Sequence, residues 1–116
     1  MPTGLNDHWR ISKYHPGDQF QGHCDASFAK SDTEESKFTV NIYMNDGFDG
    51  GATRFYHGRG GGCAFTVTPE TGMGCIFAQP TADRNYYHDG ERVRGGVKYL
   101  FRTDVMYKQT ITPYSA

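Results

Sequence analysis

Hydrophobic and polar residues alternate along short stretches of this chain, and glycine, proline, asparagine or aspartate separates one stretch from the next. Alternation with a period of two is typical of a β-strand with one buried face, and no stretch sustains the period of a helix. The pattern predicts strands at 9–14, 19–25, 37–44, 53–56, 63–67, 74–78, 85–88 and 97–107. Short strands with short connections predict an all-β sandwich or a barrel-like jelly roll.

The strand predicted at 37–44 has two chemically different faces, because successive side chains of a strand point to opposite sides. One face carries the apolar residues Phe38, Val40, Ile42 and Met44. The other carries the hydrogen-bonding residues Thr39, Asn41 and Tyr43. The apolar face requires a partner layer. The polar face either meets solvent or lines a polar cavity, and the strand alone does not decide between the two.

The strand predicted at 97–107 places two cations, Lys98 and Arg102, on the same face. In a nearly neutral domain this arrangement has two explanations. The face either binds an anion or belongs to an edge strand whose charges discourage aggregation.

Composition supports the all-β prediction and places the chain in a broad class. Glycine accounts for 15 of the 116 residues and aromatic residues for 15%. Tight turns and strands use these residues, whereas a helical bundle would be richer in alanine and leucine. A chain of this length has room for one domain.

Charge and cysteine content exclude several function classes. The formal net charge is -1, and a nucleic-acid binder would need a basic face to neutralise phosphates. Cys24, Cys63 and Cys75 are odd in number and irregularly spaced, which is a poor disulfide framework and indicates a reducing compartment. No apolar run is long enough to span a membrane, and no signal peptide is present. We expect a cytoplasmic protein that binds neither nucleic acid nor membrane.

The chemistry is concentrated first in His23 and Asp25, near the end of a predicted strand. Residues i and i+2 of a strand point the same way, so the imidazole and the carboxylate can reach one point. This pairing of ligands suits a divalent iron better than a set of soft thiolates would. Cys24 lies between them and points to the opposite face, so we expect it to pack rather than to bind metal.

His88 is the candidate for the third ligand, since His8, His15 and His57 have no comparable neighbours. Two histidines and one carboxylate form a facial triad that leaves iron positions open for oxygen and a co-substrate. Lys98 follows ten residues later. Hairpin pairing of the two segments would bring its ammonium near the metal, where it could bind the far carboxylate of a chelated dicarboxylate.

Four motifs in sequence resemble the prolyl-4-hydroxylase-like branch of the iron(II)/2-oxoglutarate dioxygenases. Residues 14–25 (YHPGDQFQGHCD) resemble its Tyr-x-x-Gly, aromatic, His-x-Asp segment. Residues 50–55 (GGATRF) resemble its Gly-Gly-x-Thr-x-Phe turn, and residues 67–77 (VTPETGMGCIF) its Val-x-Pro-x-x-Gly stretch. His88-Asp89-Gly90, with Lys98 at the family's spacing, resembles the distal histidine and the 2-oxoglutarate anchor. The match runs from about Trp9 to Tyr107.

The resemblance implies a double-stranded β-helix, a cupin-like jelly roll, whose catalytic core occupies residues 1–116. It implies iron(II) bound by His23, Asp25 and His88, with 2-oxoglutarate and dioxygen as co-substrates. The reaction would be oxidative decarboxylation to succinate and carbon dioxide, coupled to hydroxylation of a peptidyl proline or a small molecule. Halogenating relatives lack the carboxylate, so the presence of Asp25 favours hydroxylation.

The resemblance also assigns residues around the co-substrate. Tyr43 matches the family's tyrosine near 2-oxoglutarate, which turns the face of Thr39, Asn41 and Tyr43 into the cavity. Tyr14 matches a second co-substrate tyrosine. Arg102 would also point inward, toward co-substrate or substrate, while the spacing favours Lys98 as the anchor.

The chain departs from the family pattern at its N-terminus, where the usual helical support of the larger sheet is largely absent. The apolar face of Phe38, Val40, Ile42 and Met44 then lacks its cover. Exposed apolar surface of this kind marks an interface, and a homodimer through this face is one expectation. The alternative from another class is a non-catalytic, cupin-like metal-binding or interaction module.

Overall fold

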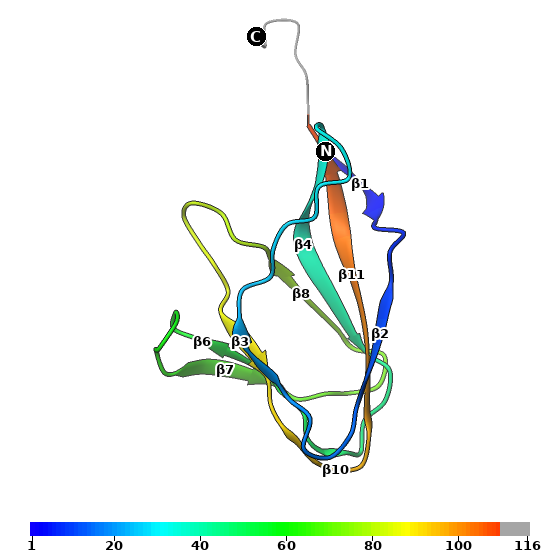
Figure 1. The fold of residues 1–116 in the computed structure, drawn as a ribbon, viewed down its shortest axis with the longest axis vertical. Coiled ribbons are helices and arrows are strands. Elements are labelled where there is room, and N and C mark those ends of the chain that lie inside the picture. The colour runs from blue at the N-terminus through cyan, green and yellow to red at the C-terminus, as the bar shows by residue number, and fades with distance from the viewer. Residues whose placement is uncertain (110–116) are drawn as a thin grey trace, which may run out of the picture.

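The computed structural model describes residues 1–109, and this part of the chain contains strands and turns but no helix (Figure 1). The strands are β1 (Pro2–Leu5), β2 (Arg10–Tyr14), β3 (Phe20–His23), β4 (Glu34–Tyr43), β5 (Asp49–Gly50), β6 (Thr53–Tyr56), β7 (Cys63–Val67), β8 (Gly74–Ala78), β9 (His88–Gly90), β10 (Val93–Gly95) and β11 (Lys98–Lys108). The all-β prediction is therefore confirmed.

The strands form two main sheets. The larger sheet has the order β1-β11-β4-β8, with β2 also paired to β11, and its centre is the long antiparallel pair of β4 and β11 (Figure 1). The smaller sheet has the order β3-β9-β6-β7, and β5 and β10 form a separate two-stranded pair. All pairings are antiparallel, and most of them, unlike that of β6 with β7, join segments that lie far apart in the sequence, which is the topology of a double-stranded β-helix.

Most predicted strands agree with the observed ones, and β6, β7 and β8 agree at both ends. The strand predicted at 85–88 is wrong: the aromatic residues there suggested a strand, but pairing begins at His88 and continues through Gly90. Tertiary pairing overrides the low strand propensity of Asp89 and Gly90, because both lie opposite residues of β6. The short strands β1, β5 and β10 were not predicted.

The polar face of β4 points into the space between the sheets. Thr39 and Tyr43 are fully buried and Asn41 is 7% exposed. The register places Arg102 beside Asn41 and Leu100 beside Tyr43 on the same inner face. This face therefore points inward as expected, although of the three residues Asn41 alone lines the metal cavity described below.

The opposite face of the larger sheet is only partly exposed along β4. Met44 is exposed, Phe38 and Ile42 are half-buried, and Val40 is buried at 7%. Val40 departs from the prediction because it lies in a central strand between Thr103 and Ile76 of the neighbouring strands. Greater exposure occurs on the flanking strands, at Ile76 (62%) and Ile11 (65%).

The structure also bears on the cysteines and on membrane-spanning segments. The three cysteines are free thiols, Cys63 exposed and the others half-buried. Within residues 1–109, no helix has the length and apolar character that crossing a membrane would require.

Candidate metal centre

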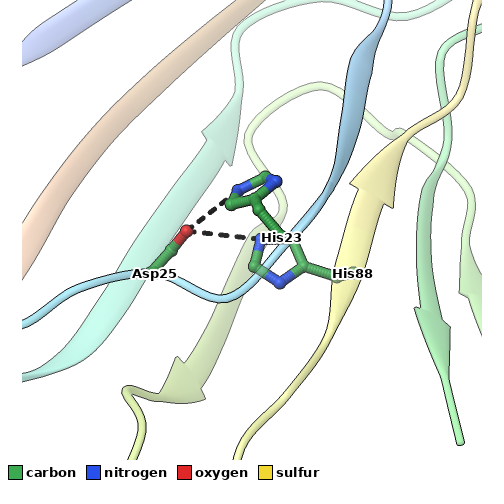
Figure 2. Close-up of side chains that lie close together, drawn as sticks. All are labelled: His23, Asp25 and His88. Atoms are coloured by element: carbon green, nitrogen blue, oxygen red, sulfur yellow. Dashed lines mark ion pairs between the residues drawn. The ribbon is translucent and has the colours of Figure 1, made fainter. Parts of the chain in front are cut away.

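Three side chains from separate parts of the smaller sheet converge on one point (Figure 2). His23 ends β3 and pairs directly with His88, the first residue of β9, while Asp25 follows β3 by two residues. One ligand atom from each residue lies within 4.8 Å of the other two. The predicted triad therefore meets in space as the sequence indicated.

The two imidazoles are held with their Nε2 atoms toward the centre. His23 Nδ1 donates to the carbonyl of Gln21 at 2.7 Å, and His88 Nδ1 donates to the carbonyl of Tyr86 at 2.8 Å. A carbonyl only accepts hydrogen bonds, so each Nδ1 carries a proton and each neutral ring keeps its lone pair on Nε2. In metal sites, a hydrogen bond from the far ring nitrogen of this kind fixes the tautomer and orientation of a ligand histidine.

The carboxylate of Asp25 divides its oxygens between two roles. Oδ2 accepts a hydrogen bond from Thr39 at 2.7 Å and lies 3.5 Å from Arg102. Oδ1 is buried and accepts no hydrogen bond within residues 1–109, although it lies 3.0 Å from His23 Nε2 and 3.5 Å from His88 Nε2. Three lone-pair atoms thus face one another without a donor, and a bound cation would satisfy all three.

The charges around Asp25 keep it ionised despite its burial. Burial alone would raise the carboxyl pKa, but in the metal-free site the protonated form of His23, with Arg102 and Thr39, lowers the pKa to about 2. Burial lowers the pKa of His88, which packs among Phe55 and Phe77 with ring centroids 5.4 and 4.6 Å away. A neutral His88 beside an ionised Asp25 is the ligand state that a divalent metal requires.

A cavity of about 110 Å³ opens from the triad between the two sheets. It is smaller than the roughly 300–1,000 Å³ of pockets for drug-sized ligands, which suits a small organic acid. The residues that line it, most of them with polar side chains, are Arg10, Ser12, Tyr14, Phe20, His23, Asp25, Asn41, Thr53, His88, Asp89, Gly90, Lys98, Leu100 and Arg102.

Lys98 lies at one end of this cavity as an isolated buried cation. It is 2% exposed, and no carboxylate within residues 1–109 lies within ion-pairing distance of its ammonium. The ammonium instead faces the aromatic rings of Tyr14 and Tyr43, whose centroids lie 4.8 and 5.9 Å from Nζ, and cation–π attraction offsets part of the cost of its burial. Burial lowers the pKa of Lys98 to about 8. An anion is the missing partner.

The prediction that hairpin pairing brings Lys98 close to His88 is wrong, although Lys98 does line the same cavity as the triad. β9 and β11 do not form a hairpin, because β10 intervenes and the two strands lie in different sheets. Lys98 instead pairs with Tyr14 of β2 and faces β9 across the cavity. A Cβ placed on Gly90 would lie 3.9 Å from Nζ and 3.2 Å from Phe20, so glycine leaves the passage between triad and lysine open.

The remaining predicted site residues occupy different positions. Tyr14 and Arg102 line the cavity. Tyr43 lies behind its wall, and the Tyr43 hydroxyl is hydrogen-bonded to Thr53, which does line it. Burial raises the pKa of Tyr43 to about 12, so its hydroxyl stays protonated.

Sequence reasoning missed several residues of the site. Thr39 and Asn41 were placed on the correct face, but their roles were not predicted: Thr39 holds Asp25, and the buried Asn41 Oδ1 has no donor within residues 1–109. Gly90 belongs to a motif that the sequence analysis used and Arg10 to none, but the role of each depends on pairings that only the fold reveals.

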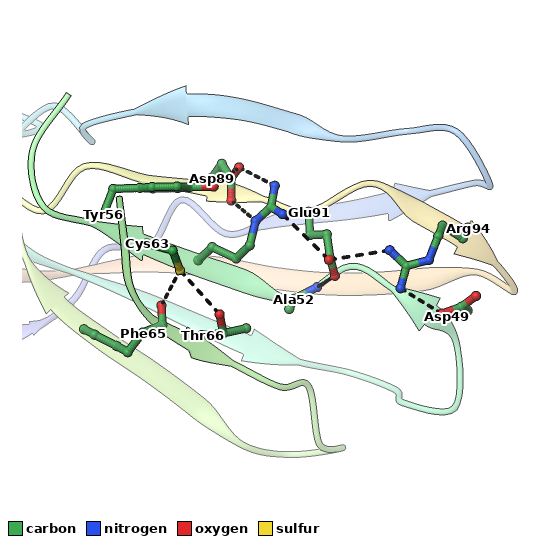
Figure 3. A network of polar contacts seen from close by, with 10 residues as sticks. Asp49, Ala52, Tyr56, Cys63, Phe65, Thr66, Asp89, Glu91 and Arg94 are labelled. Atoms are coloured by element: carbon green, nitrogen blue, oxygen red, sulfur yellow. Dashed lines mark hydrogen bonds and ion pairs between the residues drawn. The ribbon is translucent and has the colours of Figure 1, made fainter. Parts of the chain in front are cut away.

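A polar network on the outer side of the smaller sheet fixes β9 in place (Figure 3). Asp89 accepts two hydrogen bonds from Arg54 at 2.9 and 2.7 Å and a third from Tyr56 at 2.8 Å. Arg54 also lies 3.8 Å from Glu91. Because Asp89 follows His88, this bidentate clamp holds the strand that presents the distal histidine.

Comparison with solved structures shows the same fold in larger proteins. A viral collagen prolyl hydroxylase from Paramecium Bursaria Chlorella virus-1, in a 2OG complex, aligns at a TM-score of 0.59 and 19% identity, over 90% of this chain and 63% of its own. A prolyl-4-hydroxylase from Pseudomonas putida aligns at 0.63 and 22%, over 92% and 55%. An oxidoreductase of the 2OG-Fe(II) oxygenase family from Burkholderia pseudomallei aligns at 0.64 and 18%, over 88% and 43%.

These comparisons support a fold assignment, since this chain spans less than two thirds of each of those proteins. No curated protein matches the chain in sequence. The model of the 2OG-Fe(II) oxygenase superfamily matches residues 9–103, which include the triad, Lys98 and Arg102. The chain therefore belongs to the 2OG-Fe(II) oxygenase superfamily, whose cofactors are iron(II), 2-oxoglutarate and dioxygen.

Proposed function

We propose that this protein is an iron(II)- and 2-oxoglutarate-dependent dioxygenase that hydroxylates its substrate, with His23, Asp25 and His88 as metal ligands. The observation that carries the proposal is the convergence of three ligand atoms, from the buried Asp25 and His88 and the half-buried His23, with no hydrogen-bond donor to Asp25 Oδ1 within residues 1–109. A second observation supports it, because the same cavity holds the unpaired ammonium of Lys98. The triad would be satisfied by a cation, and the Lys98 ammonium by an anion.

Each residue has a defined task in this proposal. His23, Asp25 and His88 would hold iron(II), and a set of three protein ligands would leave it able to bind 2-oxoglutarate and dioxygen. When bound, iron(II) supplies the oxygen activation that no side chain can provide. Lys98 binds the far carboxylate of 2-oxoglutarate through a charge-assisted hydrogen bond, and Tyr14 covers the ammonium.

The proposed reaction consumes 2-oxoglutarate, dioxygen and a substrate C–H bond. One oxygen atom enters the substrate as a hydroxyl group and the other enters succinate, while carbon dioxide leaves. Two of the similar folds belong to prolyl hydroxylases, which supports a peptidyl proline as the substrate. Hydroxylation of a small molecule is the alternative, since substrate loops vary most among proteins of one fold.

Ordered addition of ligands tests the metal and co-substrate sites together. The thermal midpoint of the metal-free protein is measured under nitrogen with 2-oxoglutarate alone, iron(II) alone and both. Ligand at a hundred times its dissociation constant stabilises a fold by about 2.7 kcal/mol, so we expect an increase of several degrees. The increase from 2-oxoglutarate should require iron(II), because chelation and the Lys98 contact act together.

Succinate serves as the control ligand, because it has the carboxylates but lacks the oxo group needed for chelation. If 2-oxoglutarate stabilises the protein equally with and without iron(II), or not at all, the cavity is not a co-substrate site. A non-catalytic metal-binding module then becomes the better description.

We also propose that the outer face of the larger sheet is an interface between two copies of this chain. The face includes the predicted set Phe38, Val40, Ile42 and Met44 and the neighbouring side chains Trp9, Ile11, Ile76 and Phe101. Trp9 (61% exposed), Ile11 and Ile76 are the most exposed of these. A contiguous apolar surface of this kind is rare on a monomer unless it meets a partner.

Sedimentation equilibrium at micromolar concentration tests this interface. We expect the wild type to dimerise and Ile76→Glu to be monomeric, because burying a carboxylate in an apolar interface is unfavourable. Thr68→Glu adds the same charge at an exposed position after β7 and should leave the dimer intact. A monomeric wild type with these side chains in solvent contradicts the proposal.

A further inference from the structure

Two arginines stand directly opposite each other at the mouth of the metal cavity. Arg10 of β2 and Arg102 of β11 are paired residues in the antiparallel register, so their side chains leave the sheet on the same face. Both line the metal cavity. Like charges directly opposite one another on neighbouring strands repel, so this pairing needs an explanation.

The carboxylates nearby offer the pair one ion-pair partner, on Arg102. Asp25 Oδ2 lies 3.5 Å from Arg102, but the other oxygen of Asp25 faces the histidines. Asp104 lines the adjoining hollow, but side-chain amides of Gln79 and Asn6 already bind its oxygens at 2.9 and 3.2 Å. Arg10 forms no ion pair with any residue of the described range 1–109. Within residues 1–109, Asp25 is thus the one carboxylate in ion-pairing distance of the two guanidinium groups, and it is also a proposed metal ligand.

The arginine pair also lies on the boundary between two spaces. Arg10 and Arg102 line both the metal cavity and an adjoining hollow of about 300 Å³, whose other walls include His8, Ser27 and Phe28. A molecule in this hollow would therefore contact the arginines at its inner end. The hollow is large enough for a ligand in addition to the co-substrate.

The pair is separate from the co-substrate end of the cavity. Lys98 and Arg102 are four residues apart on one extended strand, which is about 13 Å along the backbone. The Lys98 ammonium lies against Tyr14 and Tyr43, whereas the Arg102 guanidinium lies against Asp25. A short dicarboxylate bound to the metal and Lys98 would leave the arginine pair free.

We infer that Arg10 and Arg102 together bind an anionic group of the primary substrate, a carboxylate or a phosphate monoester, and hold its neighbouring C–H bond toward the metal. Guanidinium groups bind both anions in bidentate fashion, so one anion bridging the pair would remove the repulsion between them. This inference rests on the proposed dioxygenase function and adds the substrate class to it.

The test compares anionic and neutral compounds of matched shape. Protein loaded with iron(II) and 2-oxoglutarate under nitrogen is titrated with N-acetylproline or N-acetylprolinamide, and separately with methyl phosphate or methanol. The thermal midpoint reports binding without turnover. Sulfate at constant ionic strength is a third, generic anion. We expect saturable stabilisation by an anionic compound and none by its neutral counterpart, and the carboxylate and phosphate arms show which anion is preferred.

Substitution of the arginines identifies the site. Arg10→Gln and Arg102→Gln should each weaken anion binding by about tenfold or more, the usual effect of losing one charge-assisted contact. Arg10→Lys keeps the charge and should retain part of the affinity. Lys13→Gln removes the same charge from the outer face of the same strand and should change nothing.

The outcomes separate this inference from the proposed function. If the loaded protein shows no anion preference, or Arg10→Gln and Lys13→Gln behave alike, the arginine pair is not a substrate site. If 2-oxoglutarate fails to stabilise the iron-loaded wild type, the proposed function itself fails. Stabilisation by 2-oxoglutarate that survives in Arg10→Gln, with loss of anion binding, supports both.

Discussion

Asp25→Asn is expected to weaken iron(II) binding by more than about a hundredfold while leaving the protein folded. Substituting groups that merely support metal ligands already costs about 10- to 100-fold in affinity, so losing a charged ligand costs more. The amide of asparagine can also turn its NH₂ group toward His23 and His88, whose Nε2 atoms lie 3.0 and 3.5 Å from the present Oδ1. Isothermal titration with iron(II) under nitrogen measures the effect.

The same substitution should lower the stability of the metal-free protein at neutral pH. The surroundings of Asp25 lower its carboxyl pKa to about 2, so the folded state stabilises the ionised carboxylate relative to the unfolded chain. The asparagine carbonyl would keep the bond from Thr39 but would lose the charge that faces Arg102. The thermal midpoint without metal should therefore decrease by a few degrees.

Asp18→Asn is the matched control. Asp18 lies in the turn before β3, where its carboxylate accepts a hydrogen bond from the backbone of His15. Its replacement changes the net charge equally and should leave iron(II) affinity unchanged. If Asp25→Asn binds iron(II) within a few-fold of the wild type, Asp25 is not a ligand and the triad must be reassigned.

The sequence could predict those parts of the site that depend on the spacing of residues within a single strand. His23 and Asp25 follow from the two-residue repeat of a strand, and the polar face of Thr39, Asn41 and Tyr43 follows from the same alternation. Both features depend on residues that are neighbours in the chain. The order of the four family motifs then brought His88 and Lys98 into the same site.

The parts that sequence could not predict depend on pairings between distant strands. The spacing of His88 and Lys98 suggested a hairpin, whereas the structure brings them together across two sheets. The pairing of Arg10 with Arg102 is evident only in the structure, because nothing in the sequence indicates that β2 and β11 are neighbouring strands. Register is set by the whole buried face and not by local propensity.

The unfavourable contacts in this protein gather in one cavity. An acceptor without a donor at Asp25, an unpaired ammonium at Lys98 and two neighbouring guanidinium groups at Arg10 and Arg102 all lie around it. Polar groups without partners and groups with perturbed pKa values gather at functional sites. The proposed metal would satisfy the first, the proposed co-substrate the second and the inferred acidic substrate the third.

Lys98→Met is expected to stabilise the metal-free protein and to abolish its response to 2-oxoglutarate. Burial lowers the pKa of Lys98 from its usual 10.5 to about 8, and each pKa unit corresponds to 1.36 kcal/mol. The charged lysine therefore reduces stability at pH 7 by about 3 kcal/mol. Methionine fills a similar volume without the charge. Chemical denaturation should show a gain of this order.

The pH dependence of stability distinguishes a buried charge from a packing effect. Between pH 8 and 10.5 the unfolded lysine keeps its proton while the folded lysine loses it, so the unfolded state binds more protons and wild-type stability rises with pH. The advantage of Lys98→Met should thus be full below pH 8 and shrink toward pH 10.5. Lys13→Met, at an exposed position, should show neither the gain nor its pH dependence.

The co-substrate response gives the other half of the prediction. 2-Oxoglutarate should stabilise iron-loaded wild type but not iron-loaded Lys98→Met, even though the latter starts from the more stable fold. Iron(II) alone should stabilise both, because the triad is intact in each. A variant that lost stability would show that the tyrosine rings and cavity polar groups already satisfy the ammonium. If Lys98→Met kept its response to 2-oxoglutarate, another cation of the cavity would bind the far carboxylate. Arg102 would be the first candidate, since it lies on the same face of β11.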